Sequence, residues 1–212
     1  MEKFITIEDV DSNENAAELK QGFIDALYQT RHKKREIDAL VDALSTSGFF
    51  TSPCSGGYHL CVEGGLLVHS MNVMNYALKV GKALLTAEEF RTMKSSIVTC
   101  ALLHDVGKIG DFGKKLYVPN ILKSGKQSTS KPFERNKQLS NVPHAIRSIK
   151  FVKDFITLSE EEEWAILCHD GLYDFMRSEL QGHETKLYLI LHTADMYCAR
   201  FFEVEATDDA EE

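Results

Sequence analysis

The chain of 212 residues is 43% hydrophobic and 26% charged, the composition of an ordinary globular domain with a substantial core. No stretch approaches the ~18 apolar residues of a membrane span, and the N-terminus lacks a signal-peptide pattern, so we expect a soluble, cytoplasmic protein. Five cysteines without a CxxC pair predict reduced, buried thiols. The net charge of −8 argues against a protein that coats long nucleic acids.

Apolar residues recur with helical spacing through most of the chain and predict an all-α fold, a single helical bundle. We expect an N-terminal helical segment packed on the core (1–48), the core itself (49–202) and an acidic, disordered tail (203–212). Two capping boxes, which begin at Thr86 and Ser159, indicate helix starts. The expected helices lie at about residues 15–44 (in two pieces), 66–85, 86–105, 143–155, 159–169 and 184–202.

A basic segment, residues 107–141, interrupts the helical pattern. It holds eight basic and two acidic side chains, so it carries a charge of +6 while the rest of the chain carries −14. A structureless segment of this length is unusual in a compact domain, and such loops are often functional lids. We expect a long basic loop, which either attracts phosphate groups to the protein or is a solvated loop with solubilising lysines.

Six residues of metal-ligand type stand on or beside the expected helices, and two of them are carboxylates in apolar surroundings. Asp105 follows an apolar helical run, and Asp195 lies within the apolar helix that contains Leu187. A buried carboxylate without a partner costs several kcal/mol, and a cation would be such a partner. Histidine offers a neutral nitrogen ligand, and aspartate offers an oxygen that can bridge two cations. The candidate ligands are His69, His104, Asp105, His144, His169 and Asp195.

The order of these residues resembles that of the HD superfamily of metal-dependent phosphohydrolases. More finely, the chain is similar to the small HD proteins of bacteria and their phages. In those proteins a Tyr-His pair precedes Gly-Gly-Leu, and a His-x-x-x-Ser motif precedes Ala-Ile-x-x-His. The matching segments here are Tyr58-His59, Gly64-Gly-Leu-Leu-Val-His69-Ser, Leu102-Leu-His-Asp-Val-Gly-Lys108, His144-Ala-Ile-Arg-Ser148, Ala165-Ile-Leu-Cys-His169 and Thr193-Ala-Asp195-Met-Tyr-Cys-Ala-Arg200.

The resemblance implies how the ligands are shared between metal ions. Members with two further histidines between the His-Asp pair and the final Asp bind a second ion, and His144 and His169 fit that pattern, with Asp105 bridging. Mononuclear members lack one or both histidines, so we expect two ions. Mixed ligation of this kind suits Mn, Fe, Co, Ni or Zn. The first ion would be held by His69, His104, Asp105 and Asp195.

These residues predict an enzyme that uses a metal-activated hydroxide to cleave a phosphate ester or anhydride in a nucleotide or related small phosphorylated metabolite. Asp105 and Lys108 are the expected catalytic residues, and Lys108 would also meet a phosphate oxygen as a point charge. The alternative for Lys108 is complementation of a helix C-terminus, worth only ~0.3–1 kcal/mol. His59 and Arg147 are the further expected substrate contacts.

Two other functions stay open at this point. The first is a 3'-5' exonuclease or phosphodiesterase that acts on short single-stranded nucleic acid. The second is a non-catalytic module that senses a nucleotide, which would require a disabled ligand set, whereas this set is complete. The first two helices could also form a surface for a homo-oligomer.

Overall fold

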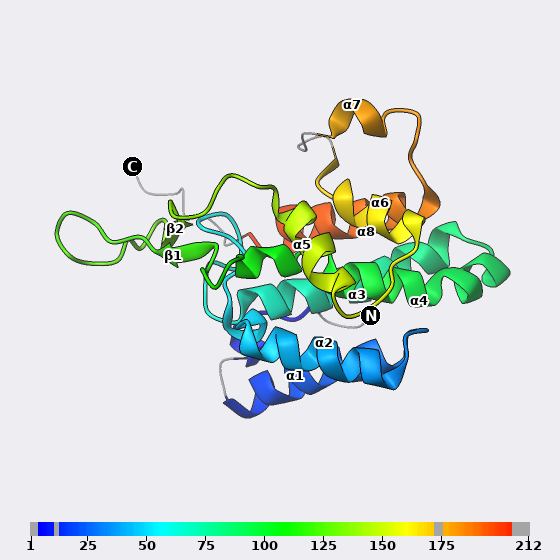
Figure 1. Ribbon diagram of the computed structural model, residues 1–212, viewed down its shortest axis with the longest axis horizontal. Helices are drawn as coiled ribbons and strands as arrows, with labels where there is room; N and C mark the ends of the chain where they lie inside the picture. Colours follow the sequence, from blue (N-terminus) through cyan, green and yellow to red (C-terminus); the bar gives the residue numbers. More distant parts are fainter. Residues whose placement is uncertain (1–3, 11–12, 172–175, 205–212) are drawn as a thin grey trace.

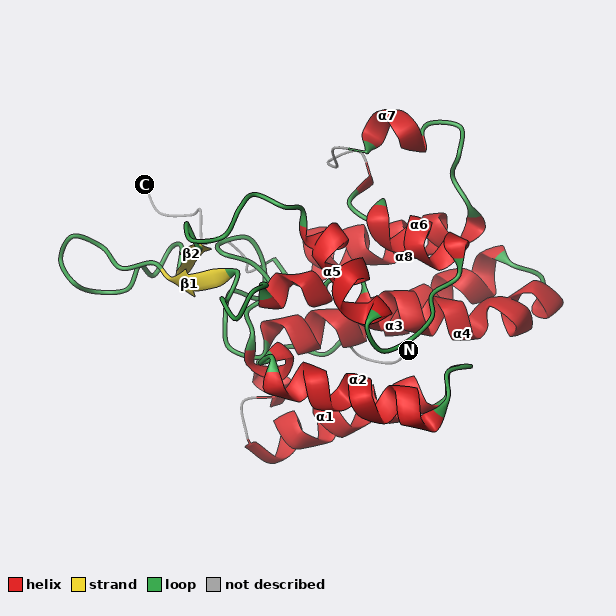
Figure 2. Cartoon of the chain, viewed as in Figure 1, coloured by secondary structure: helices red, strands yellow, loops and turns green. Residues whose placement is uncertain are grey.

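The computed structural model describes residues 4–10, 13–171 and 176–204. Eight α-helices and one small sheet lie within these ranges, which confirms the all-α prediction (Figures 1 and 2). No helix in the described ranges is long and apolar enough to cross a membrane. The α-helices are α1 (Asn13–Tyr28), α2 (Lys34–Thr46), α3 (Gly65–Leu84), α4 (Ala87–Leu103), α5 (His144–Lys153), α6 (Glu160–Leu167), α7 (Arg177–Leu180) and α8 (Lys186–Tyr197). Shorter helical turns are η1 (Glu8–Val10), η2 (Phe49–Thr51), η3 (Val106–Ile109) and the π-helical η5 (Cys198–Phe202).

Helix α3 forms the centre of the core. Its residues are buried continuously from Gly65 to Met74, and it packs against α4, α8 and α1. A helix that is apolar on all sides is stable only when neighbouring elements cover it. Helices α1 and α2 lie on one side of the α3–α4 pair, while α5, α6 and α8 lie on the other (Figure 1). The metal-ligand candidate on α3, His69, is therefore held in the middle layer.

Both predicted capping boxes are present and begin α4 and α6. The Glu89 N–H donates to Thr86 Oγ1 at 3.3 Å, and the Glu89 carboxylate accepts the Thr86 N–H at 2.9 Å. The Ser159 and Glu162 pair makes the same two bonds, at 3.3 and 2.7 Å. Each box satisfies backbone donors that the first helical turn leaves unpaired.

The N-terminal helices are tied to the core by a partly buried ion pair. Arg31, in the turn between α1 and α2, binds both carboxylate oxygens of Glu162 in α6 through its guanidinium group. The Glu162 side chain is fully buried. The Arg31 N–H also donates to Ser95 Oγ in α4 at 2.8 Å. This turn therefore joins α1 and α2 to two helices that are distant in sequence, α4 and α6.

The C-terminal helix differs from the expected continuous run at 184–202. Helix α8 ends at Tyr197, and the chain continues as the π-helical turn η5, after which the Glu203 N–H donates to Cys198 O at 3.0 Å. Glu203 is buried, although the sequence placed it in the acidic tail. Residues 205–212 of that tail lie outside the described residues.

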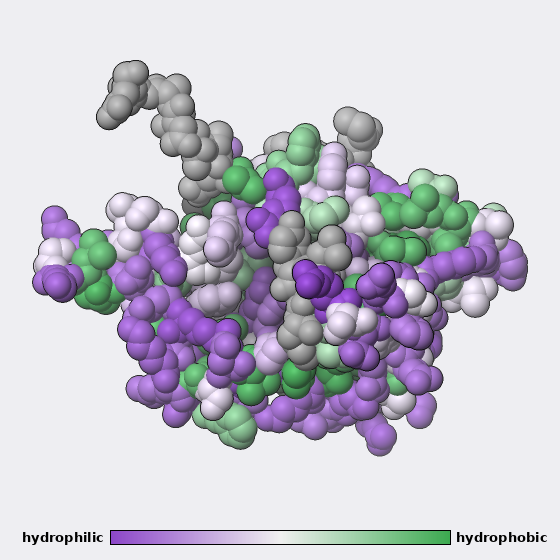
Figure 3. Space-filling view, turned by 90° about the horizontal axis from the view of Figure 1, so that it is seen from above, coloured by the Kyte–Doolittle hydropathy of each residue, from purple (hydrophilic) through white to green (hydrophobic). Residues whose placement is uncertain are grey.

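The basic segment 107–141 is mostly a long loop, as expected, and two short strands within it form a β-hairpin. Strands β1 (Tyr117–Pro119) and β2 (Phe133–Arg135) pair antiparallel, with Tyr117 opposite Arg135. The Phe133 N–H donates to Gly56 O at 3.2 Å, which fastens the base of the hairpin to the body. Beyond its strands the hairpin extends away from the helices (Figure 1). Between the strands the hairpin exposes Ile121 and Leu122. Figure 3 shows hydrophobic atoms among hydrophilic ones at its left edge.

Candidate metal centre

Five helices bring the six candidate ligands to one place in the interior. Four of the six residues are almost completely buried, whereas the His144 and Asp195 side chains keep 21% and 15% of their surface exposed. The cluster therefore lies at the bottom of an opening rather than in a closed core. The ligands come from α3 (His69), the C-terminal end of α4 (His104 and Asp105), the first residue of α5 (His144), the turn after α6 (His169) and α8 (Asp195).

The two oxygens of Asp105 face different pairs of imidazoles. Oδ1 lies 3.0 Å from His144 Nε2 and 3.4 Å from His169 Nε2. Oδ2 lies 3.4 Å from both His69 Nε2 and His104 Nε2. A carboxylate with one oxygen toward each group is suited to bridge two cations.

Asp195 completes the group around Oδ2 of Asp105. Its Oδ1 lies 3.0 Å from His69 Nε2 and 3.7 Å from His104 Nε2. Two imidazole nitrogens and two carboxylate oxygens thus meet at short range on this side of Asp105. On the other side, the His144 and His169 Nε2 atoms lie 3.0 Å from each other. Neutral imidazoles and carboxylates in such sets are typical ligands of divalent transition metals.

Buried atoms without hydrogen-bond partners show that the cluster fits a metal. His69 Nε2, His104 Nε2 and Asp105 Oδ1 are all buried and make no hydrogen bond within the described structure. A buried polar atom left in this state costs about 1–3 kcal/mol. His69 Nε2 and His104 Nε2 face Oδ2 of Asp105, whereas Oδ1 faces the imidazoles of His144 and His169. Divalent cations bound among these imidazoles would satisfy the unpartnered atoms. The donor set of nitrogen and carboxylate oxygen therefore fits the metal that the sequence predicts.

The other ring nitrogen of three ligands is held in place. His104 Nδ1 lies 2.9 Å from Ala101 O, and His169 Nδ1 lies 2.7 Å from Ile166 O. His69 Nδ1 lies 2.7 Å from Glu203 Oε2. A proton on Nδ1 that donates to oxygen leaves the Nε2 lone pair for a metal.

The Asp105 and Asp195 carboxylates give the cluster negative charge, which needs positive charge to balance it. Burial raises the pKa of a carboxyl group, but at Asp105 the charges of Lys108 and His104 outweigh burial and hold the pKa well below its usual value. At Asp195 the adjacent imidazoles of His104 and His69 outweigh burial in the same way and hold its pKa well below its usual value. Both carboxylates are therefore ionised, and imidazolium or a divalent cation can balance them.

Gly107 lets α5 approach the turn that carries Asp105. A Cβ atom at this position would lie 2.0 Å from His144 O and 2.7 Å from Ser148 N. The Gly107 N–H donates to Ser148 Oγ at 2.8 Å. The role of this glycine in the structure is close packing. It brings His144 within reach of Asp105.

The comparison with protein-family models matches residues 66–199, more than half of the chain, to the HD domain. The chain belongs to the HD-domain family. Members of this family are typically metal-dependent phosphohydrolases, which supports a metal-dependent hydrolase in general. The comparisons with curated proteins and with solved structures found no match.

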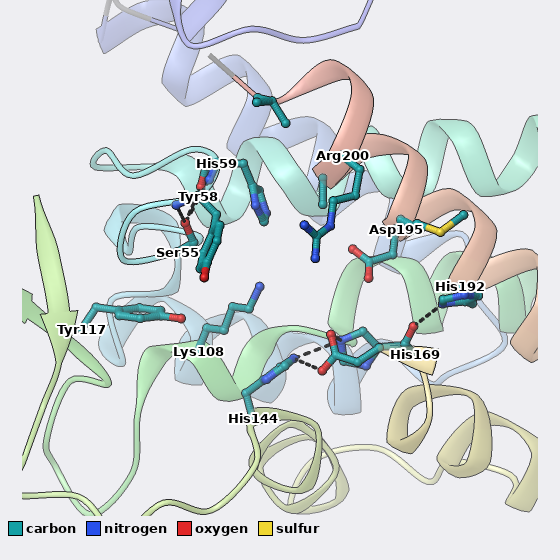
Figure 4. Close-up of a pocket in the computed structure, with 14 residues that line it drawn as sticks. Ser55, Tyr58, His59, Lys108, Tyr117, His144, His169, His192, Asp195 and Arg200 are labelled. Atoms are coloured by element: carbon teal, nitrogen blue, oxygen red, sulfur yellow. Dashed lines mark hydrogen bonds and ion pairs between the residues drawn. The ribbon is translucent and has the colours of Figure 1, made fainter. Parts of the chain in front are cut away.

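A cavity of about 550 Å³ opens beside the ligands of this HD domain. His144, His169 and Asp195 form part of its lining (Figure 4). Lys108 and Arg200 point into it from opposite sides, one from η3 and the other from η5 (Figure 4). A polyanion that enters the cavity would meet both cations and the ligand cluster.

Lys108 lies between the cavity and the Asp105 carboxylate. Its Nζ is 2.6 Å from Asp105 Oδ2 and 3.6 Å from Cys54 Sγ. Burial disfavours the charged form, but Asp105 outweighs burial and raises the pKa of Lys108 well above its usual value. Of the eight basic side chains in segment 107–141, all of which the structure describes, Lys108 alone lines the cavity.

His59 lies on the cavity wall, and 11% of its side chain is exposed. Burial, together with the nearby His69 and Lys108, lowers the pKa of His59 to about 3, so its ring is neutral. Its Nε2 lies 3.3 Å from Cys54 Sγ and 3.9 Å from Glu203 Oε2. A neutral ring in this place can contact a substrate by hydrogen bonding but supplies no positive charge.

Arg147 does not reach the cavity, although the sequence suggested it as a substrate contact. Its guanidinium donates to Asp111 Oδ2 at 2.9 Å and to Ser140 O at 3.1 Å, and the side chain is 3% exposed. Lys150 joins the same carboxylate at 2.9 Å. Arg147 therefore anchors the start and the end of the hairpin segment on α5.

Sequence reasoning missed two residues that the structure places at the centre. Arg200 was quoted as part of a motif but given no role, and Glu203 was assigned to the tail. No local pattern distinguishes a buried glutamate from its acidic neighbours, because its burial depends on the turn η5. His192, one turn before Asp195 in α8, lies with its Nδ1 2.7 Å from His169 O.

Proposed function

We propose that the protein is a binuclear phosphohydrolase that cleaves a phosphate ester or anhydride in a nucleotide. The observation that carries this proposal is the geometry of Asp105, whose two oxygens face two separate groups of imidazoles beside a cavity with two cationic side chains. Membership of the HD-domain family supports the reaction class. The residues that line the cavity support a nucleotide as the substrate.

Two divalent ions would be shared through Asp105. One would take His69, His104 and Asp195 as its further ligands, and the other would take His144 and His169. We expect manganese or iron, with cobalt, nickel and zinc as alternatives, because imidazole and carboxylate ligands suit all of them. When bound, such ions supply Lewis acidity, which lowers the pKa of water and neutralises phosphoryl charge.

The chain's own residues orient and neutralise the phosphate. Lys108 enters the cavity as a charged ammonium group that Asp105 holds at 2.6 Å. Arg200 faces it and can bind two phosphate oxygens with its planar guanidinium group. The two cations stand on opposite sides, so they favour a substrate with more than one anionic oxygen near the reacting phosphorus. Asp105 acts by holding the two groups of imidazoles in a fixed position relative to each other.

The outer part of the cavity is suited to an aromatic base. Tyr58 lines it and is 82% exposed, on a loop that is held because Ser55 Oγ accepts the Tyr58 N–H at 2.9 Å. Met196 and Val204 also line the cavity and are partly exposed. An exposed aromatic ring on a fixed loop offers a surface on which a base can stack, worth about 1–3 kcal/mol.

A substrate screen tests this proposal. Purified protein with Mn²⁺ is assayed against nucleoside mono-, di-, tri- and cyclic phosphates, with ribose 5-phosphate as the phosphate without a base. We expect hydrolysis of at least one nucleotide, and loss of both metal and activity in His104→Ala and Asp105→Ala. The proposal fails if the metal-loaded protein hydrolyses none of these compounds and the two variants retain their metal content.

The same screen separates the alternatives. Hydrolysis of short single-stranded oligonucleotides, but not of mononucleotides, would favour the exonuclease function, and the basic hairpin beside the cavity gives that outcome a physical basis. Tight nucleotide retention without turnover would favour a sensing module. For the base itself, Tyr58→Ala should lower kcat/KM for nucleotides roughly 5- to 100-fold relative to ribose 5-phosphate. An equal effect on both substrates would remove the stacking argument.

A further inference from the structure

Glu203 is a buried carboxylate whose two oxygens are both engaged. Its Oε2 lies 2.7 Å from His69 Nδ1, and its Oε1 accepts a hydrogen bond from Asn72 Nδ2 at 3.1 Å. His69 and Asn72 lie one turn apart on α3, so Glu203 spans one face of the central helix. Removing a carboxylate from water is costly unless its partners are well placed. Such a residue therefore has a specific role.

Asn72 in turn connects Glu203 to the N-terminal segment. Its Nδ2 donates to Ile5 O at 2.9 Å as well as to Glu203, and its Oδ1 accepts the Ile5 N–H at 2.9 Å. Both amide hydrogens of Asn72 are thus used, which sets the orientation of the side chain. Phe4 stacks on Phe202, the residue before Glu203, with ring centroids 3.5 Å apart. The two ends of the described chain meet behind His69.

The position of His69 explains why it needs a partner from another element. His104 and His169 stand at the C-terminal ends of α4 and α6, where carbonyl groups of the last turn lack helical donors and can accept from Nδ1. His69 lies inside α3, where the helix uses its own carbonyl groups. Glu203 supplies the missing acceptor, and as a carboxylate it also increases the basicity of the ring.

We propose that Glu203 is a positioning residue: it keeps the proton of His69 on Nδ1 and presents Nε2 to the metal, while Asn72 and Ile5 hold the carboxylate in place. This inference rests on the binuclear centre proposed above, but it concerns metal binding and not the reaction. It assigns a role to the N-terminal segment, which does not contact the ligand cluster directly. Integrity of the metal centre thus depends on both ends of the described chain.

Metal titration of the full chain tests the role of Glu203. Binding of Co²⁺ and Mn²⁺ is measured by calorimetry, and the visible absorption of Co²⁺ reports its coordination. We expect Glu203→Ala to weaken binding about 10- to 100-fold and to alter the Co²⁺ spectrum. Glu203→Gln keeps an oxygen acceptor without the charge, so it should fall between Glu203→Ala and the unaltered protein. Asn72→Ala, which leaves Glu203 in place, should weaken binding to a smaller extent.

The matched control is Glu88→Gln, which removes one carboxylate from an exposed pair with Arg91 and should leave both readouts unchanged. A purely structural role would lower the thermal stability of the metal-free variants without changing the affinity or the spectrum. That result overturns the inference. So does a metal affinity of Glu203→Ala within twofold of the control, or a failure of the unaltered protein to bind either ion. If Glu203→Ala does not fold, the graded effects of Glu203→Gln and Asn72→Ala decide. If the protein binds metal but hydrolyses no substrate, the proposed function fails and the role of Glu203 in metal binding stands.

Discussion

Replacing Gly107 with alanine should force α5 away from the turn that carries Asp105. The added Cβ would lie 2.0 Å from His144 O and 2.7 Å from both Arg147 Cβ and Ser148 N. Backbone atoms stand on two of these sides, so rotation of a flexible side chain cannot relieve the overlap. Helix α5 must move by about 1 Å to relieve the severe overlap with His144 O, and by about 1.4 Å to restore an ordinary contact distance.

The displacement has two measurable consequences. Overpacking of this kind costs about 1–3 kcal/mol, which for a domain of this size lowers the thermal midpoint by roughly 2–12 °C. Movement of α5 also carries His144 away from Asp105 Oδ1, from which its Nε2 now lies 3.0 Å. A misplacement of about 1 Å can reduce activity roughly 10²-fold. The second metal ion of the proposed centre, for which His144 is a ligand, should be lost before the first.

Thermal unfolding and metal content by elemental analysis check this prediction. The matched control is Gly22→Ala in α1, where a Cβ would meet only Met71 Cε at 3.6 Å. Alanine inside a helix is favoured over glycine by about 1 kcal/mol, so the control should be as stable as the unaltered protein or more stable. If Gly107→Ala matches the control in thermal midpoint and in metal content, close approach of α5 is not what positions His144.

Three further predictions follow from other contacts. Lys108→Ala should lower kcat/KM for phosphate substrates roughly 10- to 100-fold through loss of a charge-assisted bond of about 1.5–3 kcal/mol, and an unchanged value would exclude Lys108 from substrate binding. The ion pair with Arg31 outweighs burial and lowers the pKa of Glu162, so the pair stabilises the fold above the unfolded pKa near ~4.3 and this stabilisation is lost as pH falls through the lower folded pKa. Glu162→Gln should therefore be less stable than the unaltered protein in urea at pH 7, and the difference in unfolding free energy should shrink below about pH 4. A difference that does not depend on pH would contradict this assignment. Chelation of a metal present at 100 times its Kd should remove about 2.7 kcal/mol and lower the thermal midpoint by roughly 5–10 °C, whereas an unchanged midpoint would argue against a metal bound to the folded chain.

The helices that could be predicted are those with local signals. Thr86 and Ser159 begin helices through bonds to a residue three positions later, so a short stretch of sequence contains the whole interaction. The hairpin in segment 107–141 was missed because its strands have three residues each and are separated by a long exposed turn. Strands this short leave no alternation of apolar and polar residues to detect.

The candidate ligands could be found because the chain places histidines and carboxylates in apolar helical runs, where such residues need partners. By itself, the sequence determined the fold class, the HD family and the identity of these candidates. Only the tertiary structure decided that each oxygen of Asp105 faces its own pair of imidazoles, that Arg147 turns to Asp111 and away from the cavity, and that Glu203 lies behind His69. The reason is physical: composition and periodicity report which side chains need burial or charge. The partner that meets each need depends on elements distant in sequence.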